Sequence, residues 1–196
     1  MRLSHTCQGY RSRFGSMRGV SLIEVLISIL LSAIGLLALA GANVASIRYS
    51  KMAQYRGTAT LLATDIGERM RANKAGLTGY EVALDFAAQA TAPAVDTSCS
   101  GYLVPMCTPA SLATYDLNNW RFLVRKQLPA GSVFITTQPN GVPNAADVWL
   151  VWRDPAVASV ATGEVNDQPT TALECPSGLN LDSDASIRCS YFRINL

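Results

Sequence analysis

One acidic residue interrupts an apolar stretch near the start of this 196-residue chain. Glu24 lies five residues after Gly19, among valine, leucine and isoleucine residues, and the charged residues before Gly19 are all arginines. A carboxylate near the centre of a bilayer costs about 2.5–3.5 kcal/mol, so an acid inside a membrane segment marks a functional site. Glu24 is therefore a candidate site residue, and the question that it raises is which partner it binds.

Residues for catalysis are scarce elsewhere in the chain. The single histidine, His5, lies in the basic leader that precedes the apolar stretch. Loss of that leader would remove every histidine-based triad, and the sequence contains no Gly-rich phosphate loop, HExxH motif or Walker-type lysine. We expect no enzyme, no catalytic residue and no cofactor.

The cysteines predict disulfide bonds. Cys7 lies in the leader, and Cys99, Cys107, Cys175 and Cys189 form an even set in the remainder of the chain. Of the three possible pairings, we favour Cys99 with Cys107 and Cys175 with Cys189, because each closes a local loop. A zinc site built from all four cysteines is the alternative, but no CxxC spacing supports it.

One group of polar residues resembles a calcium loop. Asn180, Asp182 and Asp184 alternate as calcium ligands do, but the glycine and the distal glutamate of an EF-hand are missing. We interpret the segment as a polar turn and expect no metal site.

The apolar run at residues 20–42 is long enough to cross a membrane. As a helix, its 23 residues would span roughly 34 Å, and a hydrocarbon core is about 30 Å thick. The arginines before the run place residues 1–19 in the cytoplasm and send the chain after Ala42 to the periplasm.

Small and polar side chains share one side of this expected helix with Glu24. They recur at intervals of three, four or seven residues, at Ser21, Ser28, Ser32, Gly35, Ala42 and Ser46. Small residues let helices approach closely in lipid, so this stripe favours assembly with other helices. The alternative is an isolated anchor whose serines bond to their own backbone.

A secretory signal peptide is a rival interpretation of the same run. Ala38-Leu39-Ala40 before Gly41 satisfies the small-residue rule for cleavage, and the mature chain would then begin at Gly41. The apolar run is longer than the usual 7–15 residues of such a peptide, which favours the anchor. An acid would also serve no purpose in a discarded peptide.

The helical period continues beyond the membrane segment, over residues 43–75, with Gly76 as the expected stop. Asp65 and Arg69 are spaced for an i,i+4 ion pair. Apolar residues at a spacing of mostly three or four mark one face: Val44, Ile47, Met52, Tyr55, Ala59, Leu62, Ile66 and Met70.

The pattern of residues 76–196 predicts a head domain that contains both helices and strands. We expect a short helix at 81–90, a loop at 91–109 and a clearer helix at 111–128, followed by strands at 132–137, 147–153 and 187–196. A turn at 138–141 separates the first two strands. The fold class is therefore α+β, a long N-terminal helix packed on a small antiparallel sheet. Trp120, Trp149 and Trp152 should lie in the core or on the sheet, and residues 156–180 form a connector or a display loop.

The charge of the head argues against nucleic acid. From Gly76 to the C-terminus there are six basic and eleven acidic residues. Proteins that track a phosphate backbone have the opposite balance, so we expect no nucleic acid as a direct partner.

The sequence Gly19-Val20-Ser21-Leu22-Ile23-Glu24 before an apolar helix resembles the class III signal of type IV prepilins and related pseudopilins. The resemblance implies that prepilin peptidase cuts between Gly19 and Val20 and that the new amine of Val20 is methylated. Glu24 is then the assembly residue, paired with a free N-terminal amine in the growing fibre. Val20 replaces the commoner Phe or Met, and Met17 is a possible alternative start.

A second segment is more specific. Residues 34–41 together with residues 61–74, which contain Arg69-Met70-Arg71-Ala72-Asn73, resemble the PilV family of minor pilins. That resemblance implies a type IV pilin-like fold, anchored in the inner membrane and later part of the extracellular pilus. The implied partners are other minor pilins, the major pilin, the inner-membrane assembly platform and, before assembly, membrane lipid. Its implied role is to join the priming complex at or near the pilus tip and to promote pilus assembly, and so motility, adhesion or DNA uptake. A pseudopilin of type II secretion is the alternative.

Overall fold

The computed structural model describes residues 19–100, 107–154, 175–181, 184 and 186–196. The chain divides into two compact units at Ser46 and Ile47, and each is described by itself. Both contain part of helix α1, Leu22–Ala72. This helix starts and ends within three residues of the predicted limits, and neither Gly57 nor Gly67 interrupts it.

In the first unit, α1 exposes its apolar side chains. Leu22 and Ile23 are 77% and 64% exposed, and similar exposure continues to Ile47. Among the described residues, α1 is the helix that is long and apolar enough to cross a membrane. The exposed apolar surface is what a lipid-facing segment requires, since the surrounding hydrocarbon takes the place of a protein core.

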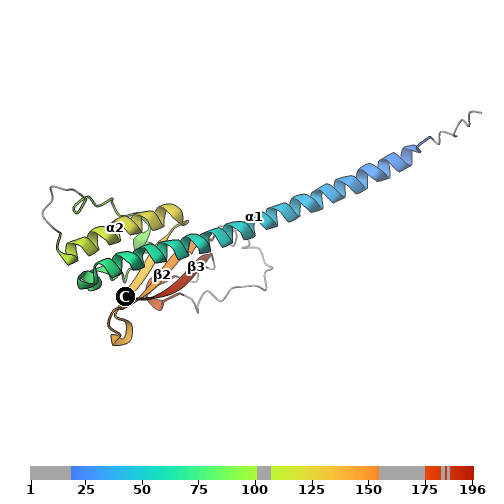
Figure 1. The fold of residues 1–196 in the computed structure, drawn as a ribbon. Helices are drawn as coiled ribbons and strands as arrows, with labels where there is room; N and C mark the ends of the chain where they lie inside the picture. Colours follow the sequence, from blue (N-terminus) through green and yellow to red (C-terminus); the bar gives the residue numbers. More distant parts are fainter. Residues whose placement is uncertain (1–18, 101–106, 155–174, 182–183, 185) are drawn as a thin grey trace, which may run out of the picture. The chain divides into compact units, whose positions relative to one another are not determined.

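The second unit contains the rest of the fold (Figure 1). A 3-10 helix, η1 (Lys74–Tyr80), follows α1, and a short one, η2 (Ala87–Gln89), precedes helix α2 (Pro109–Gln127). The strands β1 (Ser132–Thr137), β2 (Ala145–Arg153) and β3 (Ile187–Asn195) form one antiparallel sheet in the order β1-β2-β3. The 3-10 helices η3 (Pro139–Gly141) and η4 (Ser177–Leu179) lie in the connections. The predicted α+β arrangement is confirmed.

The main core lies between the sheet and the two helices of this unit. It buries Leu62, Ile66 and Met70 from the predicted face of α1, together with Trp120 from α2. The sheet contributes alternate residues to the same core, among them Val133, Ile135, Val148, Leu150, Trp152 and Ile194. The predicted apolar face of α1 is thus buried from Ala59 onward, whereas Val44 and Ile47 are more than half exposed.

The other face of the sheet carries a second, smaller cluster. Val151, Leu179, Ile187 and Cys189 are buried there. Phe134, Trp149 and Tyr191 are register partners across the three strands, and neighbouring rings lie 5.8 Å and 5.0 Å apart between centroids. The expectation that the tryptophans lie in the core or on the sheet is confirmed.

The prediction of a helix at residues 81–90 is wrong over most of its length. Val82 instead pairs with Ile135 through both backbone groups, at 3.0 and 2.9 Å. The Gln89 side chain continues this pairing, since its amide bonds to both the N–H and the carbonyl of Val133. An uncovered strand edge leaves backbone groups without partners, so closing the edge of β1 decides the conformation of the segment.

Gly76 lies where η1 passes close to the start of α2. A Cβ atom at this position would overlap the Pro109 carbonyl and the Asn73 amide, whereas a Cβ at Gly57 would meet no atom within 4 Å. The two glycines therefore have different roles, which the helical pattern of the sequence does not distinguish. Gly76 permits a close backbone approach, and Gly57 is only a weak point of α1.

We expect Gly76→Ala to destabilise the protein by about 1–3 kcal/mol, because the backbone of η1 or α2 must shift. The matched control is Gly57→Ala, which should stabilise the helix by about 0.5–1 kcal/mol. Denaturant unfolding of the full chain in detergent, followed by tryptophan fluorescence, measures both. Equal effects of the two substitutions would contradict the close approach at Gly76.

Candidate functional site

The N-terminal candidate site occupies the start of α1. Gly19 and Val20 are exposed and non-helical, with the Val20 residue 68% exposed, and α1 begins two residues later at Leu22. Glu24 lies in the first helical turn, where its backbone N–H donates to the Ser21 carbonyl at 3.0 Å. A negative charge in this turn is favourable beside the positive end of the helix dipole. The three residues implicated by the sequence therefore lie within one short, exposed segment.

The serines after Glu24 use their own backbone. Ser28 Oγ donates to the Glu24 carbonyl and Ser32 Oγ to the Ser28 carbonyl, both at 2.7 Å. In the single chain, these two serines therefore bond to the backbone of their own helix, which is the alternative that the sequence left open. Such bonds satisfy the hydroxyl donors inside an apolar helix without a partner helix.

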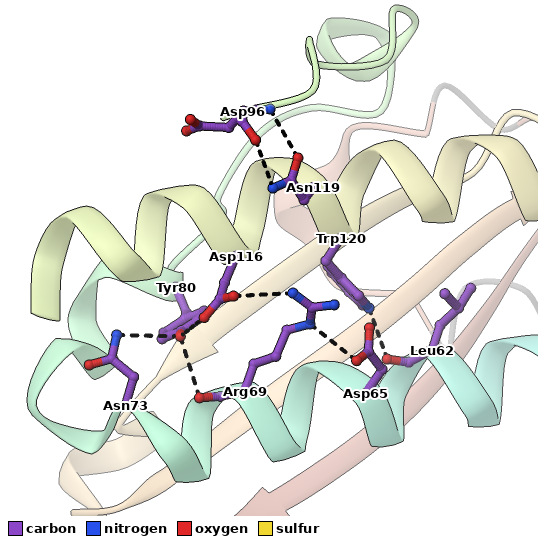
Figure 2. A network of polar contacts seen from close by, with 9 residues as sticks. All are labelled: Leu62, Asp65, Arg69, Asn73, Tyr80, Asp96, Asp116, Asn119 and Trp120. Atoms are coloured by element: carbon purple, nitrogen blue, oxygen red, sulfur yellow. Dashed lines mark hydrogen bonds and ion pairs between the residues drawn. The ribbon is translucent and has the colours of Figure 1, made fainter. Parts of the chain in front are cut away.

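A second polar site holds α1 and α2 together inside the second unit (Figure 2). Arg69 on α1 bonds through Nε to Asp65 Oδ1 and through Nη1 to Asp116 Oδ1 on α2, both at 3.1 Å. The Asp65–Arg69 pair is the one that the spacing predicted. Asp116 is 9% exposed, so its charge depends on Arg69 and on the hydroxyl of Tyr80, which donates to Oδ2 at 2.7 Å.

Two further bonds complete this interhelical network. Asn73 donates its amide to the Pro109 carbonyl at 2.7 Å, across the close approach at Gly76. Trp120 Nε1 donates to the Leu62 carbonyl at 2.9 Å. Buried polar groups are stable only when they are bonded in this way, so the network fixes how α2 lies on α1 within the second unit.

The environment of the network shifts two pKa values. Burial opposes the charge of Arg69, but the hydrogen bonds and attraction of Asp65 and Asp116 outweigh it, so the pKa of Arg69 lies above its ordinary value. Burial also raises the pKa of Tyr80 well above its ordinary value, and its bond to Asp116 acts in the same direction. The native network therefore contains a neutral phenol and a charged guanidinium.

The run from Arg69 to Asn73 has a structural role that the sequence did not reveal. Arg69 binds α2, Arg71 donates to the carbonyl of Asn195 at the end of β3 at 3.2 Å, and Asn73 binds the residue that starts α2. In the sequence, the run served only as part of the family resemblance. A signal was present in α2, because Asp116 falls on the same helical face as Ala113 and Trp120, where an acid needs a partner.

The structure contains both expected disulfides, with Cα–Cα distances of 6.1 Å for Cys99–Cys107 and 5.4 Å for Cys175–Cys189. The first closes the loop before α2, and Asn119 on α2 holds this loop through two bonds to the Asp96 backbone, at 2.9 and 3.1 Å. The second joins the η4 segment to β3. Cys99, Cys107, Cys175 and Cys189 therefore form disulfide bonds, so their thiols are not available as zinc ligands.

The polar turn near residue 180 uses its side chains within the fold. Asn180 donates to Asp85 at 2.8 Å, and Asp184 accepts from Arg153 at 2.8 Å and from Ser186. Asp182, the other expected ligand, lies outside the described residues. Within the part of the chain that the structure describes, no three His, Cys, Asp or Glu residues gather as metal ligands do.

Residues 43–118 match the family model described as Tt1218-like, type IV pilin Tt1218. The match covers less than half of the chain, from the middle of α1 into α2, and includes the whole Arg69–Asp116–Tyr80–Asn73 network. No curated protein and no solved structure matches the chain. Over this segment the chain is similar to type IV pilins, which are structural, non-enzymatic proteins, and the long helix followed by a small antiparallel sheet is type IV pilin-like.

We expect Asp116→Ala to cost about 2–3 kcal/mol, because it removes one of the two carboxylates that bind the partly buried Arg69 and the acceptor of the shortest hydrogen bond of the Tyr80 hydroxyl. The control is Glu68→Ala, which breaks the Arg71 pair at a side chain that is 66% exposed. An exposed pair of this kind contributes about 0–1 kcal/mol. Denaturant unfolding compares the two variants, and a loss for Asp116→Ala no larger than that for Glu68→Ala would refute the role of the network.

The raised pKa of Tyr80 predicts a loss of stability in alkali. Above about pH 10 the unfolded chain releases the tyrosine proton while the native state keeps it, so the unfolded state binds fewer protons and the free energy of unfolding falls as pH rises. Tyr80→Phe has no such proton and should show a shallower decline between about pH 9.5 and 11.5. The wild-type slope is the reference, and identical slopes for the two proteins would contradict the prediction.

Proposed function

We propose that this chain is a minor pilin of a type IV pilus. Prepilin peptidase cuts the leader of residues 1–19 from it on the cytoplasmic side of the inner membrane and methylates Val20. Residues 20–42 anchor the mature protein in the membrane, residues 43–75 extend the helix into the periplasm, and residues 76–196 form the periplasmic head. The protein then joins the other minor pilins and the major pilin to prime or promote pilus assembly at the inner-membrane platform.

The observation that carries the proposal is the position of Glu24 at the start of α1. Exposed, non-helical Gly19 and Val20 leave the bond between them accessible to a peptidase, and the acid follows within the first turn. The part of α1 that lies in the first unit keeps its apolar surface exposed. This surface supports membrane insertion before assembly and packing against other helices afterwards. The family match at residues 43–118 supports the same conclusion from an independent part of the chain.

The proposed role of Glu24 follows from electrostatics in a medium of low dielectric. Cleavage would create a positive amine on Val20, and in a fibre the amine of one subunit would face the Glu24 carboxylate of its neighbour. Leaving either charge unpaired in an apolar environment is costly, whereas pairing relieves both costs at once. The pair would therefore set the position at which an incoming subunit stops.

N-terminal sequencing and intact mass of the membrane-bound protein test the proposal. A minor pilin begins at Val20 and carries one added methyl group, whereas a secreted domain cleaved after Ala40 begins at Gly41. A mature chain that begins at Gly41 would rule out the anchor. Co-purification with pilus components rather than secretion components separates the minor pilin from a pseudopilin of type II secretion.

We expect Glu24→Ala to be inserted and cleaved normally but to be lost from purified pili, because the Val20 amine of this or a neighbouring subunit then lacks its partner. Ser28→Ala is the matched control, one turn further along the same stripe, since Ser28 bonds only to its own helix among the described residues. Immunoblots of the membrane and pilus fractions measure both steps. Incorporation of Glu24→Ala at the level of Ser28→Ala would reject the pairing.

A further inference from the structure

Two arginines lie one turn apart on α2 beside a small recess, and their environments differ. Arg125 is satisfied inside the fold, because its guanidinium donates to the carbonyls of Ala90 and Gly131. Arg121 is half-buried, yet its guanidinium has no hydrogen bond or ion pair with any described residue. A partly buried charge without a partner is unfavourable, so Arg121 is an exception that requires an explanation.

Among the described residues, those around Arg121 offer no acid. The recess is lined by Arg121 and Arg125 together with polar and apolar residues, including Gln89, Thr91 and Ser132, and no carboxylate is among them. Burial lowers the pKa of Arg121, which is the shift expected when no carboxylate compensates for lost hydration. The like charges at an i,i+4 spacing on α2 add a further small repulsion.

The neighbouring groups leave Arg121 as the principal free donor of the recess. The Gln89 amide is occupied by Leu84 and Val133, and the Ser132 hydroxyl donates to the Ala130 carbonyl. The Thr91 hydroxyl has no partner among the described residues. A guanidinium and a hydroxyl that face a shared recess are complementary to an oxyanion.

The size of the recess favours a side chain over a free ion. The recess is partly open to solvent, and about 10 Å³ of it can hold a water-sized group, which is room for about one oxygen atom. A carboxylate carried on a flexible side chain can place one oxygen inside while the rest of its residue remains outside. Arg is also the residue best suited to carboxylates at protein interfaces, because its planar donors match the two oxygens.

We propose that the Arg121 recess on α2 is a docking site for an acidic side chain, Asp or Glu, of a partner protein. The partner supplies the carboxylate that no described residue of this chain offers to Arg121. The site lies on the head, so it is independent of the Glu24 pairing at the start of α1.

Titration of the full chain in detergent tests the chemistry of the recess, with sodium acetate as the probe and sodium chloride at equal ionic strength as the reference. We expect the Arg121 side-chain NMR signals to move saturably with acetate and not with chloride, whereas the same titration of Lys126→Gln should match the wild type. No saturable shift, or a shift only with sodium sulfate, would overturn the proposal.

A stability measurement excludes a purely structural role. Arg121→Met keeps the aliphatic part of the side chain and removes a charge that is unpaired within the described chain, so its Tm should equal or exceed that of the wild type. A Tm well below the wild-type value would show that Arg121 supports the fold itself and would overturn the proposal.

The source of the carboxylate is tested by zero-length carbodiimide coupling in the native cells. Arg121→Lys places an amine at the recess, and peptide mass spectrometry should find an amide that joins position 121 to one Asp or Glu of a second polypeptide. Lys126, exposed on the same helix, reports unspecific coupling. An amide within the same chain, or coupling at position 121 no more selective than at Lys126, would contradict a partner site.

Discussion

The ion pair between Arg69 and Asp116 is the constraint on which the second unit depends. It joins the last turns of α1 to the middle of α2 at 3.1 Å, and Asp116 is nearly excluded from solvent. Because little water reaches the Asp116 carboxylate, its charge must be compensated by protein groups. Helix α2 can therefore adopt only positions that keep Arg69 and Tyr80 within hydrogen-bonding distance of Asp116. The Trp120 and Asn73 bonds act at either side of this pair and fix the direction of α2 on the helix beneath it.

The sheet depends on that arrangement in two ways. One face supplies alternate residues to the core under α1 and α2, while the other supports a smaller cluster closed by Leu179 and the Cys175–Cys189 bond. The β1 edge is covered by Val82 and by the side chain of Gln89. A covered edge removes a common route to uncontrolled pairing with other chains.

The chain separates two kinds of association chemistry. At the start of α1, exposed apolar side chains and one acid are suited to lipid and to other helices, where charge pairing is strong because water is absent. The head carries an excess of acids, and several of its buried polar side chains, among them Asp116 and Gln89, are held in specific hydrogen bonds. A protein proposed to leave the membrane and enter a fibre requires both surfaces on one polypeptide.

The sequence by itself determined the features that depend on residues close together in the chain. The period of apolar residues predicted α1 and α2, β-branched runs predicted the three strands, and short spacing favoured the pairing of Cys99 with Cys107 and of Cys175 with Cys189 that the structure contains. The position of Glu24 behind Gly19 was equally visible.

Only the tertiary structure decided the partners of residues far apart in the chain. It turned residues 81–90 from an expected helix into the cover of β1 and gave Arg69 and Asn73 their contacts with α2. It also left Arg121 without an acid among the residues that the structure describes. Such outcomes depend on which backbone edges and charges meet after the chain has folded. No local pattern encodes them, since a strand edge or a buried acid acquires its requirement for a partner only when packing removes the water around it.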